Sequence, residues 1–228
     1  MKQDVKIIAH RGYSSLYPDN SLEGFEKAST LGANMIETDI REARDGALIC
    51  SHDKTSGAAL PFSDALAFAK NKIPLLLDLK LDDPDFHVKV AQEILRHNMQ
   101  DGVIIGVRSL AQAKHIKSLL PTVQLLGFLK PHDLPAFYQM GGNIGRLWES
   151  DINEQNMQLA KSGEHPVFIM AGSWPKGIVG VGDITPERIR KIMSWDVQGI
   201  LVNDPKLALQ VRDEPAKPAA RSPNGPRS

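Results

Sequence analysis

The 228-residue sequence contains a single cysteine, Cys50, and has no excess of charge of either sign. One cysteine cannot form an intrachain disulfide, so a disulfide-stapled fold is excluded and a reducing compartment is indicated. Lysine plus arginine and aspartate plus glutamate each number 27, so no overall field attracts nucleic acid or an anionic membrane. A charged substrate must therefore be bound by a local cluster, and nucleic acid is not an expected partner.

The sequence also lacks a long apolar run near its beginning. Lys2, Asp4 and Lys6 surround a very short apolar stretch, which is neither a secretory signal nor a membrane span. We therefore expect a cytoplasmic protein without stable membrane insertion. Cys50 lies in the apolar stretch ALICSHD, and we interpret it as a small buried side chain rather than a nucleophile. The sequence leaves the oligomeric state open.

Eight short apolar runs are present, with amphipathic segments between them. This alternation predicts strands and helices around a parallel sheet. The runs are VKIIA, NMIETDI, IPLLLDL, GVIIGV, VQLLGFL, IGRLWES, PVFIMAG and GILVND. Helices are predicted over residues 21–32, 63–71, 85–98, 109–120, 133–141, 153–163 and 185–196. At this length the pattern favours an α/β protein with a single-domain (β/α)8 TIM barrel, and an open doubly wound sheet is the alternative.

Two segments depart from the strand–helix alternation. After the second run, the turn pair Asp45-Gly46 in MIETDIREARDGALICSHD leaves no room for a helix and predicts an extended or hairpin excursion. From Arg212 onward, RDEPAKPAARSPNGPRS is rich in Pro, Arg, Ala and Ser and has no aliphatic periodicity. We therefore predict a barrel over residues 1–211 and a disordered tail over residues 212–228.

Titratable side chains gather at the ends of the first three predicted barrel strands. A spacing of two residues places both members of a pair on the same side of a strand, and the C-terminal strand ends form the active-site face of such a barrel. The excursion after the second strand adds a further histidine in CSHD. The candidate site residues are His10, Arg11, Glu37, Asp39, His52, Asp78 and Lys80.

These residue types suit phosphoryl chemistry. Carboxylates provide hard oxygen ligands for one divalent cation, Mg2+ or Ca2+, while arginine and lysine stabilise phosphate oxygens and histidines transfer protons. Taken singly, each residue has an ordinary structural role, since a strand-end histidine is usually a hydrogen-bonded structural residue and a Glu-x-Asp pair usually faces solvent. Three neighbouring strands that all end in charges would leave several charges desolvated without a ligand or ion, so we favour a functional site.

The sequence resembles the glycerophosphodiester phosphodiesterase family of metal-dependent TIM-barrel enzymes. The resemblance is carried by AHRG, PDNSLEGFEKASTLGANMIETDIREARDGALICSHD, LLLDLK and VQGILVNDP, which occur in the family order. It implies hydrolysis of a small-molecule phosphodiester to glycerol 3-phosphate and an alcohol. It also implies roles for individual residues: a general acid and base in His10 and His52, phosphate-binding cations in Arg11 and Lys80, metal ligands in Glu37, Asp39 and Asp78, and a braced first loop through Asp19 and Asn20.

The sequence departs from the family pattern at a few positions. Asp19 and Asp78 stand where glutamate is usual, and each is shorter by one methylene. We expect metal binding to survive, because a hard-cation site adjusts through a bridging water or a small backbone shift. The usual long insertion after the His-Asp motif is missing, and Asn203 stands where a threonine is common. Trp174 lies in a Gly-rich segment, and two interpretations of it are equally favoured: it lines the site, or it is buried in the packing of the protein.

Other activities stay open at this point. They are lysophospholipase D activity, a sphingomyelinase-D-like reaction in which a substrate hydroxyl attacks phosphorus and a cyclic phosphate forms, and a ligand-binding barrel without turnover. The cyclising relatives are secreted and carry disulfides, which fits a sequence with one cysteine less well. The sequence does not distinguish Mg2+ from Ca2+, the acid histidine from the base, or one alcohol from another.

Overall fold

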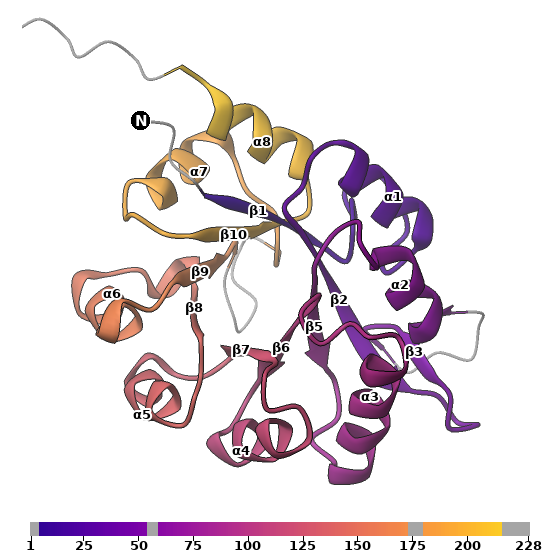
Figure 1. Cartoon of the computed structure of the whole chain (residues 1–228). Coiled ribbons are helices and arrows are strands. Elements are labelled where there is room, and N and C mark those ends of the chain that lie inside the picture. Colours follow the sequence, from indigo (N-terminus) through magenta and orange to yellow (C-terminus); the bar gives the residue numbers. More distant parts are fainter. Residues whose placement is uncertain (1–4, 54–58, 173–179, 216–228) are drawn as a thin grey trace, which may run out of the picture.

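The barrel is closed by pairing of its first and second strands (Figure 1). The computed structural model describes residues 5–53, 59–172 and 180–215. Strand β1 pairs in parallel with both β10 and β2, which completes the ring, so the predicted single-domain (β/α)8 TIM barrel is confirmed and the open sheet is wrong. The parallel strands around the ring are β1 (Lys6–His10), β2 (Met35–Glu42), β5 (Leu75–Leu79), β6 (Val103–Val107), β7 (Gln124–Gly127), β8 (Ile144–Trp148), β9 (Val167–Met170) and β10 (Gly199–Val202).

Helices lie on the outside of the barrel, as Figure 1 shows. The side-chain oxygens of Ser21 and Thr185 accept backbone N–H groups at the starts of α1 and α7, so both act as N-caps. None of the described helices is long and apolar enough to cross a membrane. The helices are α1 (Leu22–Thr30), α2 (Phe62–Ala69), α3 (Pro84–Arg96), α4 (Leu110–Leu119), α5 (Leu134–Gln139), α6 (Glu154–Ala160), α7 (Pro186–Met193) and α8 (Pro205–Asp213), with short 3-10 turns η1 (Pro131–Asp133), η2 (Glu149–Asp151) and η3 (Ser162–Glu164).

The excursion after β2 is an antiparallel hairpin. Strand β3 (Leu48–Cys50) pairs with the end of β2 and with the short β4 (Leu60–Pro61). The turn between β2 and β3 contains Gly46 at φ +86°, a conformation that glycine adopts without strain. The predicted hairpin form of the excursion is confirmed.

The C-terminal boundary of the barrel differs from the prediction. Helix α8 was not predicted, and it continues through Arg212 and Asp213, beyond the boundary at residue 211. Arg212 Nη1 donates to Asn34 Oδ1 at 2.9 Å, a long-range contact that anchors the end of this helix. Residues 216–228 lie outside the described residues, so disorder of the tail stays a prediction.

Strand alternation divides the barrel interior into an apolar layer and a polar layer. Inward-facing apolar side chains from every barrel strand fill the lower layer: Ile8, Met35, Leu76, Ile104, Leu126, Ile144, Phe168 and Leu201. Two residues further along, the same faces of several strands carry polar groups, because side chains of one strand face repeat every second residue. The polar layer at the C-terminal ends includes His10, Glu37, Asp78, Arg146 and Asn203.

Candidate active site

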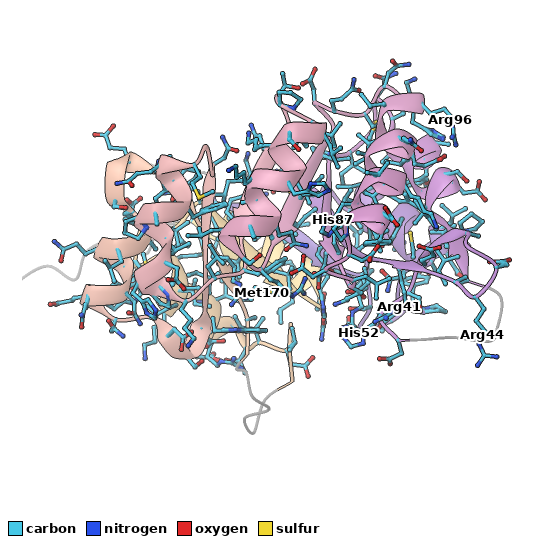
Figure 2. The ribbon with its side chains drawn as sticks, turned by 90° about the horizontal axis from the view of Figure 1, so that it is seen from below. Arg41, Arg44, His52, His87, Arg96 and Met170 are labelled. Atoms are coloured by element: carbon cyan, nitrogen blue, oxygen red, sulfur yellow. The ribbon has the colours of Figure 1, made fainter. Side chains whose placement is uncertain are left out.

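A cavity of about 470 Å³ lies at the C-terminal ends of the barrel strands. In Figure 2, His52 lies at the lower edge of the barrel, whereas Arg96 at the end of α3 lies at the upper edge. All seven candidate residues line the cavity, although they come from β1, β2, β5 and the segments that follow them: His10, Arg11, Glu37, Asp39, His52, Asp78 and Lys80. The structure therefore brings the predicted set together.

Three buried carboxylates form the centre of the site. Glu37 and Asp39 lie on one face of β2, and Asp78 is the register partner of Asp39 on the neighbouring β5. One oxygen from each of the three lies within 4.8 Å of the others. Burial, followed by the charges of Asp39 and Asp78, raises the pKa of Glu37 well above its usual value. Asp78 belongs to this cluster although its side chain is one methylene shorter than the glutamate that is usual in the family.

Two basic side chains compensate part of this negative charge. Lys80 Nζ lies 2.7 Å from Asp39 Oδ1 and 2.5 Å from Asp78 Oδ2, and Arg11 Nε lies 3.0 Å from Asp39 Oδ2. Burial favours the neutral form of Asp39, but the charges of Lys80 and Arg11 outweigh it and lower the pKa of this carboxyl. Within the described residues, Glu37 has no lysine or arginine at ion-pair distance.

The loop after β1 is held by side-chain hydrogen bonds. Gly12 has φ +85°, and a Cβ there would lie 2.9 Å from the Gly24 carbonyl carbon, so only glycine fits without displacement. Asp19 Oδ2 accepts from Arg11 Nη1 at 2.6 Å, and Asn20 Nδ2 donates to Asp39 Oδ2 at 3.0 Å. The predicted bracing by Asp19 and Asn20 is confirmed, and the shorter Asp19 still reaches the guanidinium.

The hydrogen bonds of Asn203 define the tautomer of His10. Asn203 Nδ2 donates to the Val181 carbonyl at 2.9 Å and to Asp183 Oδ1 at 2.8 Å, so its Oδ1 is the acceptor that faces His10 Nδ1 at 2.6 Å. His10 Nδ1 therefore carries a proton, and Nε2 of the neutral ring has a free lone pair. Burial, followed by the charge of Arg11, lowers the pKa of His10 to about 4, so the ring is neutral at pH 7.

His52 reaches the cavity from the hairpin rather than from a barrel strand. Its side chain is 45% exposed, and Nδ1 lies 2.9 Å from Asp53 Oδ1. Arg41 Nη2 donates to the backbone carbonyl of His52 at 2.7 Å, which ties the hairpin to β2. The two histidines thus differ, because one is buried and neutral and the other lies at the open rim.

Sequence reasoning missed a basic and aromatic cluster on the other side of the cavity. Arg146 is an inward residue of β8, and its guanidinium lies 5.0 Å from the Phe128 ring centroid and 4.7 Å from that of Trp148. Arg108, after β6, pairs with Asp78 at 2.5 Å and lies 5.0 Å from the same Phe128 ring. The signal was the period-two pattern Ile144, Arg146, Trp148, which places the arginine on the inward face.

Two further predictions concern residues near the site. Cys50 is 3% exposed, and burial raises the pKa of its thiol to about 12, which confirms the interpretation as a buried side chain. Trp174 lies outside the described residues, so its assignment to the site or to packing stays open.

Comparisons with known proteins agree on one family. The profile of the glycerophosphoryl diester phosphodiesterase family matches residues 10–126. The chain is 34% identical over 215 residues to the "probable glycerophosphodiester phosphodiesterase 2" of Mycobacterium tuberculosis, covering 80% of this chain and 73% of that protein.

Solved structures of phosphodiesterases have the same fold. A glycerophosphodiester phosphodiesterase from Agrobacterium tumefaciens superposes with a TM-score of 0.74 at 18% identity, over 90% of this chain and 99% of the other. An Oleispira antarctica phosphodiesterase in complex with the product sn-glycerol-3-phosphate superposes with a TM-score of 0.71 at 15% identity, over 92% and 97% of the two chains.

Proposed function

Because the chain belongs to the glycerophosphoryl diester phosphodiesterase family and is an enzyme of that class, we propose that it hydrolyses glycerophosphodiesters to glycerol 3-phosphate and an alcohol with the help of one divalent cation. The observation that carries the proposal is the cluster of Glu37, Asp39 and Asp78 beside His10 in one cavity. A barrel that binds ligand without turnover is not supported, since both histidines are retained at the site.

A divalent cation fits the residues that are present. The donors are carboxylate oxygens, the ligands that Mg2+ and Ca2+ prefer. Glu37 is 2% exposed and accepts the backbone N–H of Arg11, but within the described residues no lysine or arginine side chain lies at ion-pair distance from it, so its negative charge lacks the compensation that Asp39 receives. Glu37, Asp39 and Asp78 would hold the ion. When bound, the cation stabilises the negative charge that develops on the phosphate oxygens.

We assign the two histidines different tasks. Neutral His10, with the lone pair of Nε2 free, accepts the proton of the attacking water, and its Nδ1–H remains bonded to Asn203. His52, at the rim, donates a proton to the leaving alkoxide oxygen. Asp53 Oδ1 lies 2.9 Å from Nδ1 of His52 and orients the ring for that step.

Arg11 and Lys80 orient the diester. Both side chains are largely buried at the carboxylate cluster, and their cationic groups are suited to the non-bridging oxygens of a phosphodiester. Holding these oxygens fixes the phosphorus in line between the attacking water and the leaving group.

The test is hydrolysis of glycerophosphocholine and related glycerophosphodiesters in Mg2+, Ca2+ or EDTA, with the products followed by phosphorus NMR. We expect release of glycerol 3-phosphate that requires the cation and falls by about 10²–10⁴-fold in His10→Ala. His97→Ala is the matched control, because His97 caps α3 at the other end of the barrel.

Two results would contradict the proposal. A cyclic phosphate as the final product would show that a substrate hydroxyl, and not water, attacks the phosphorus. A folded protein that binds the cation but turns over no glycerophosphodiester would remove the proposed substrate class.

A further inference from the structure

Arg146 is a buried cation that has no ion-pair partner among the residues that the structure describes. It is 9% exposed, and its Nε has no hydrogen-bond partner. Within the described residues, its guanidinium forms no ion pair and donates no hydrogen bond to protein, and it lies against the faces of Phe128 and Trp148. Buried charges are normally paired, and the cavity carboxylates Asp78 and Asp151 act on this guanidinium without an ion pair, so its place in the lining indicates that an anionic ligand completes it.

The protein preserves this arrangement with specific packing. A Cβ on Gly106 would lie 1.9 Å from Cε2 of Phe128, so glycine at this position leaves room for the ring. Phe128 in turn supports both Arg108 and Arg146, each with its guanidinium carbon 5.0 Å from the ring centroid. Stacking on aromatic faces holds a guanidinium flat while leaving its edge free to donate hydrogen bonds.

The position of Arg146 separates it from the site of phosphodiester cleavage. Around the ring, the order β1, β2, β5, β6, β7, β8, β9, β10 places β8 diametrically opposite β2, which carries Glu37 and Asp39 (Figure 1). A diester whose phosphorus lies at the carboxylates would therefore direct its other half across the cavity toward β7 and β8. Lys130, which follows β7, lines the same side.

The charge of the cavity favours a second anionic group. Counting only residues that the structure describes, its lining has five cationic side chains, from arginine and lysine, and four carboxylates. A divalent cation at the acidic cluster would raise the excess of positive charge to three. A simple phosphodiester has one negative charge, so it neutralises only part of this excess.

We infer that Arg146, assisted by Arg108 and Lys130, forms a second anion subsite that binds a phosphate or carboxylate on the alcohol half of the diester. The inference rests on the proposed function and adds the substrate class: diesters whose leaving alcohol is itself acidic. The second anion contacts the edge of the Arg146 guanidinium between Phe128 and Trp148.

The experiment compares three diesters that differ only in their terminal group. They are glycerophosphoglycerol, the same compound with a terminal phosphate, and its analogue with a terminal carboxylate. The wild type should have a kcat/KM higher by on the order of 10- to 100-fold for the anionic substrates, as expected for a charge-assisted hydrogen bond. The ratio between the phosphate and carboxylate forms identifies the preferred anion.

Variants assign the preference to Arg146. Arg146→Gln should remove most of the preference, and Arg146→Lys should retain part of it, because the charge remains but the flat fork is lost. Arg96→Gln is the control, since that arginine lies on α3 with 68% of its side chain exposed. Equal kcat/KM for neutral and anionic diesters would overturn the inference. An equal loss for all diesters in Arg146→Gln would also overturn it, because Arg146 would then serve the scissile phosphate.

Binding separates this inference from the proposed function. In a His10→Ala background with Ca2+, calorimetry should give the same preference for the anionic diesters as a ratio of Kd values, and Arg146→Gln should abolish it. If no diester is hydrolysed by the wild type but this ratio persists, the proposed function fails and the anion subsite stands. Equal Kd values would overturn the subsite even if glycerophosphodiesters are hydrolysed.

Discussion

Replacing Arg146 by methionine should stabilise the ligand-free protein while impairing its use of acidic substrates. Methionine keeps a long unbranched side chain in the space between Phe128 and Trp148 and removes the unpaired charge. Burial, followed by the charge of Arg108, lowers the pKa of Arg146 from 12.5 to about 10. At 1.36 kcal/mol per pKa unit, this shift means that keeping Arg146 charged in the folded protein costs about 3 kcal/mol.

The expected gain is smaller than this figure because favourable contacts are also lost. Two cation–π contacts contribute about 1 kcal/mol each, so Arg146→Met should raise the free energy of unfolding by ~1 kcal/mol. For a chain of this size, that gain corresponds to a rise in Tm of about 2–4 °C. Because the folded pKa lies below the unfolded one, the penalty is fully present at pH 7 and is relieved only as the pH rises above about 10.

The assay is urea unfolding at pH 7 in EDTA, followed by circular dichroism, together with a thermal scan. Arg96→Met is the control, since an exposed substitution of this kind should change the free energy of unfolding by no more than about 0.5 kcal/mol. A loss of stability of ~1 kcal/mol or more in Arg146→Met would contradict this prediction, because it would mean that the folded protein already compensates the guanidinium charge.

Three other predictions concern the acidic cluster, the first loop and the thiol. In EDTA, Glu37→Gln should be more stable than the wild type, and the difference in the free energy of unfolding should grow as the pH rises above about 4.5. The pKa of Glu37 is higher in the folded protein than in the unfolded chain, so the folded wild type holds this proton more tightly. The wild type therefore loses stability as the pH rises and the proton is released. Urea unfolding at two pH values checks this, and a difference that does not change with pH would contradict it. Gly12→Ala should cost roughly 2–4 kcal/mol in the same assay, from the positive φ and the clash with Gly24, whereas a cost below about 0.5 kcal/mol would show that the loop relaxes freely. Cys50 should react with a thiol reagent only after unfolding, and labelling at equal rates in native buffer and in denaturant would contradict its burial.

Much of the barrel could be predicted because its determinants are local. Each of the eight apolar runs is a short segment that must be buried. The turn pair Asp45-Gly46 between two strand-forming segments indicates a hairpin. Helix α8 was missed because its segment adjoins a tail rich in proline, and its last turn is stabilised by Arg212 reaching Asn34, a contact between residues far apart in the chain. Such a contact leaves no periodic signal in the sequence.

The candidate site divides in the same way. The local pairs could be read from the sequence, because a spacing of two places Glu37 with Asp39 and Asp78 with Lys80 on one strand face. Which of these faces meet depends on the fold. Closure of the barrel places Asn203 against His10, 193 positions away.

The same closure sets Arg146 across the cavity from the carboxylates. Side-chain alternation is a property of each strand, whereas the neighbours across a closed barrel depend on strand order and register. The acidic half of the cavity was therefore predictable from short sequence segments, and the side chains that face it were not.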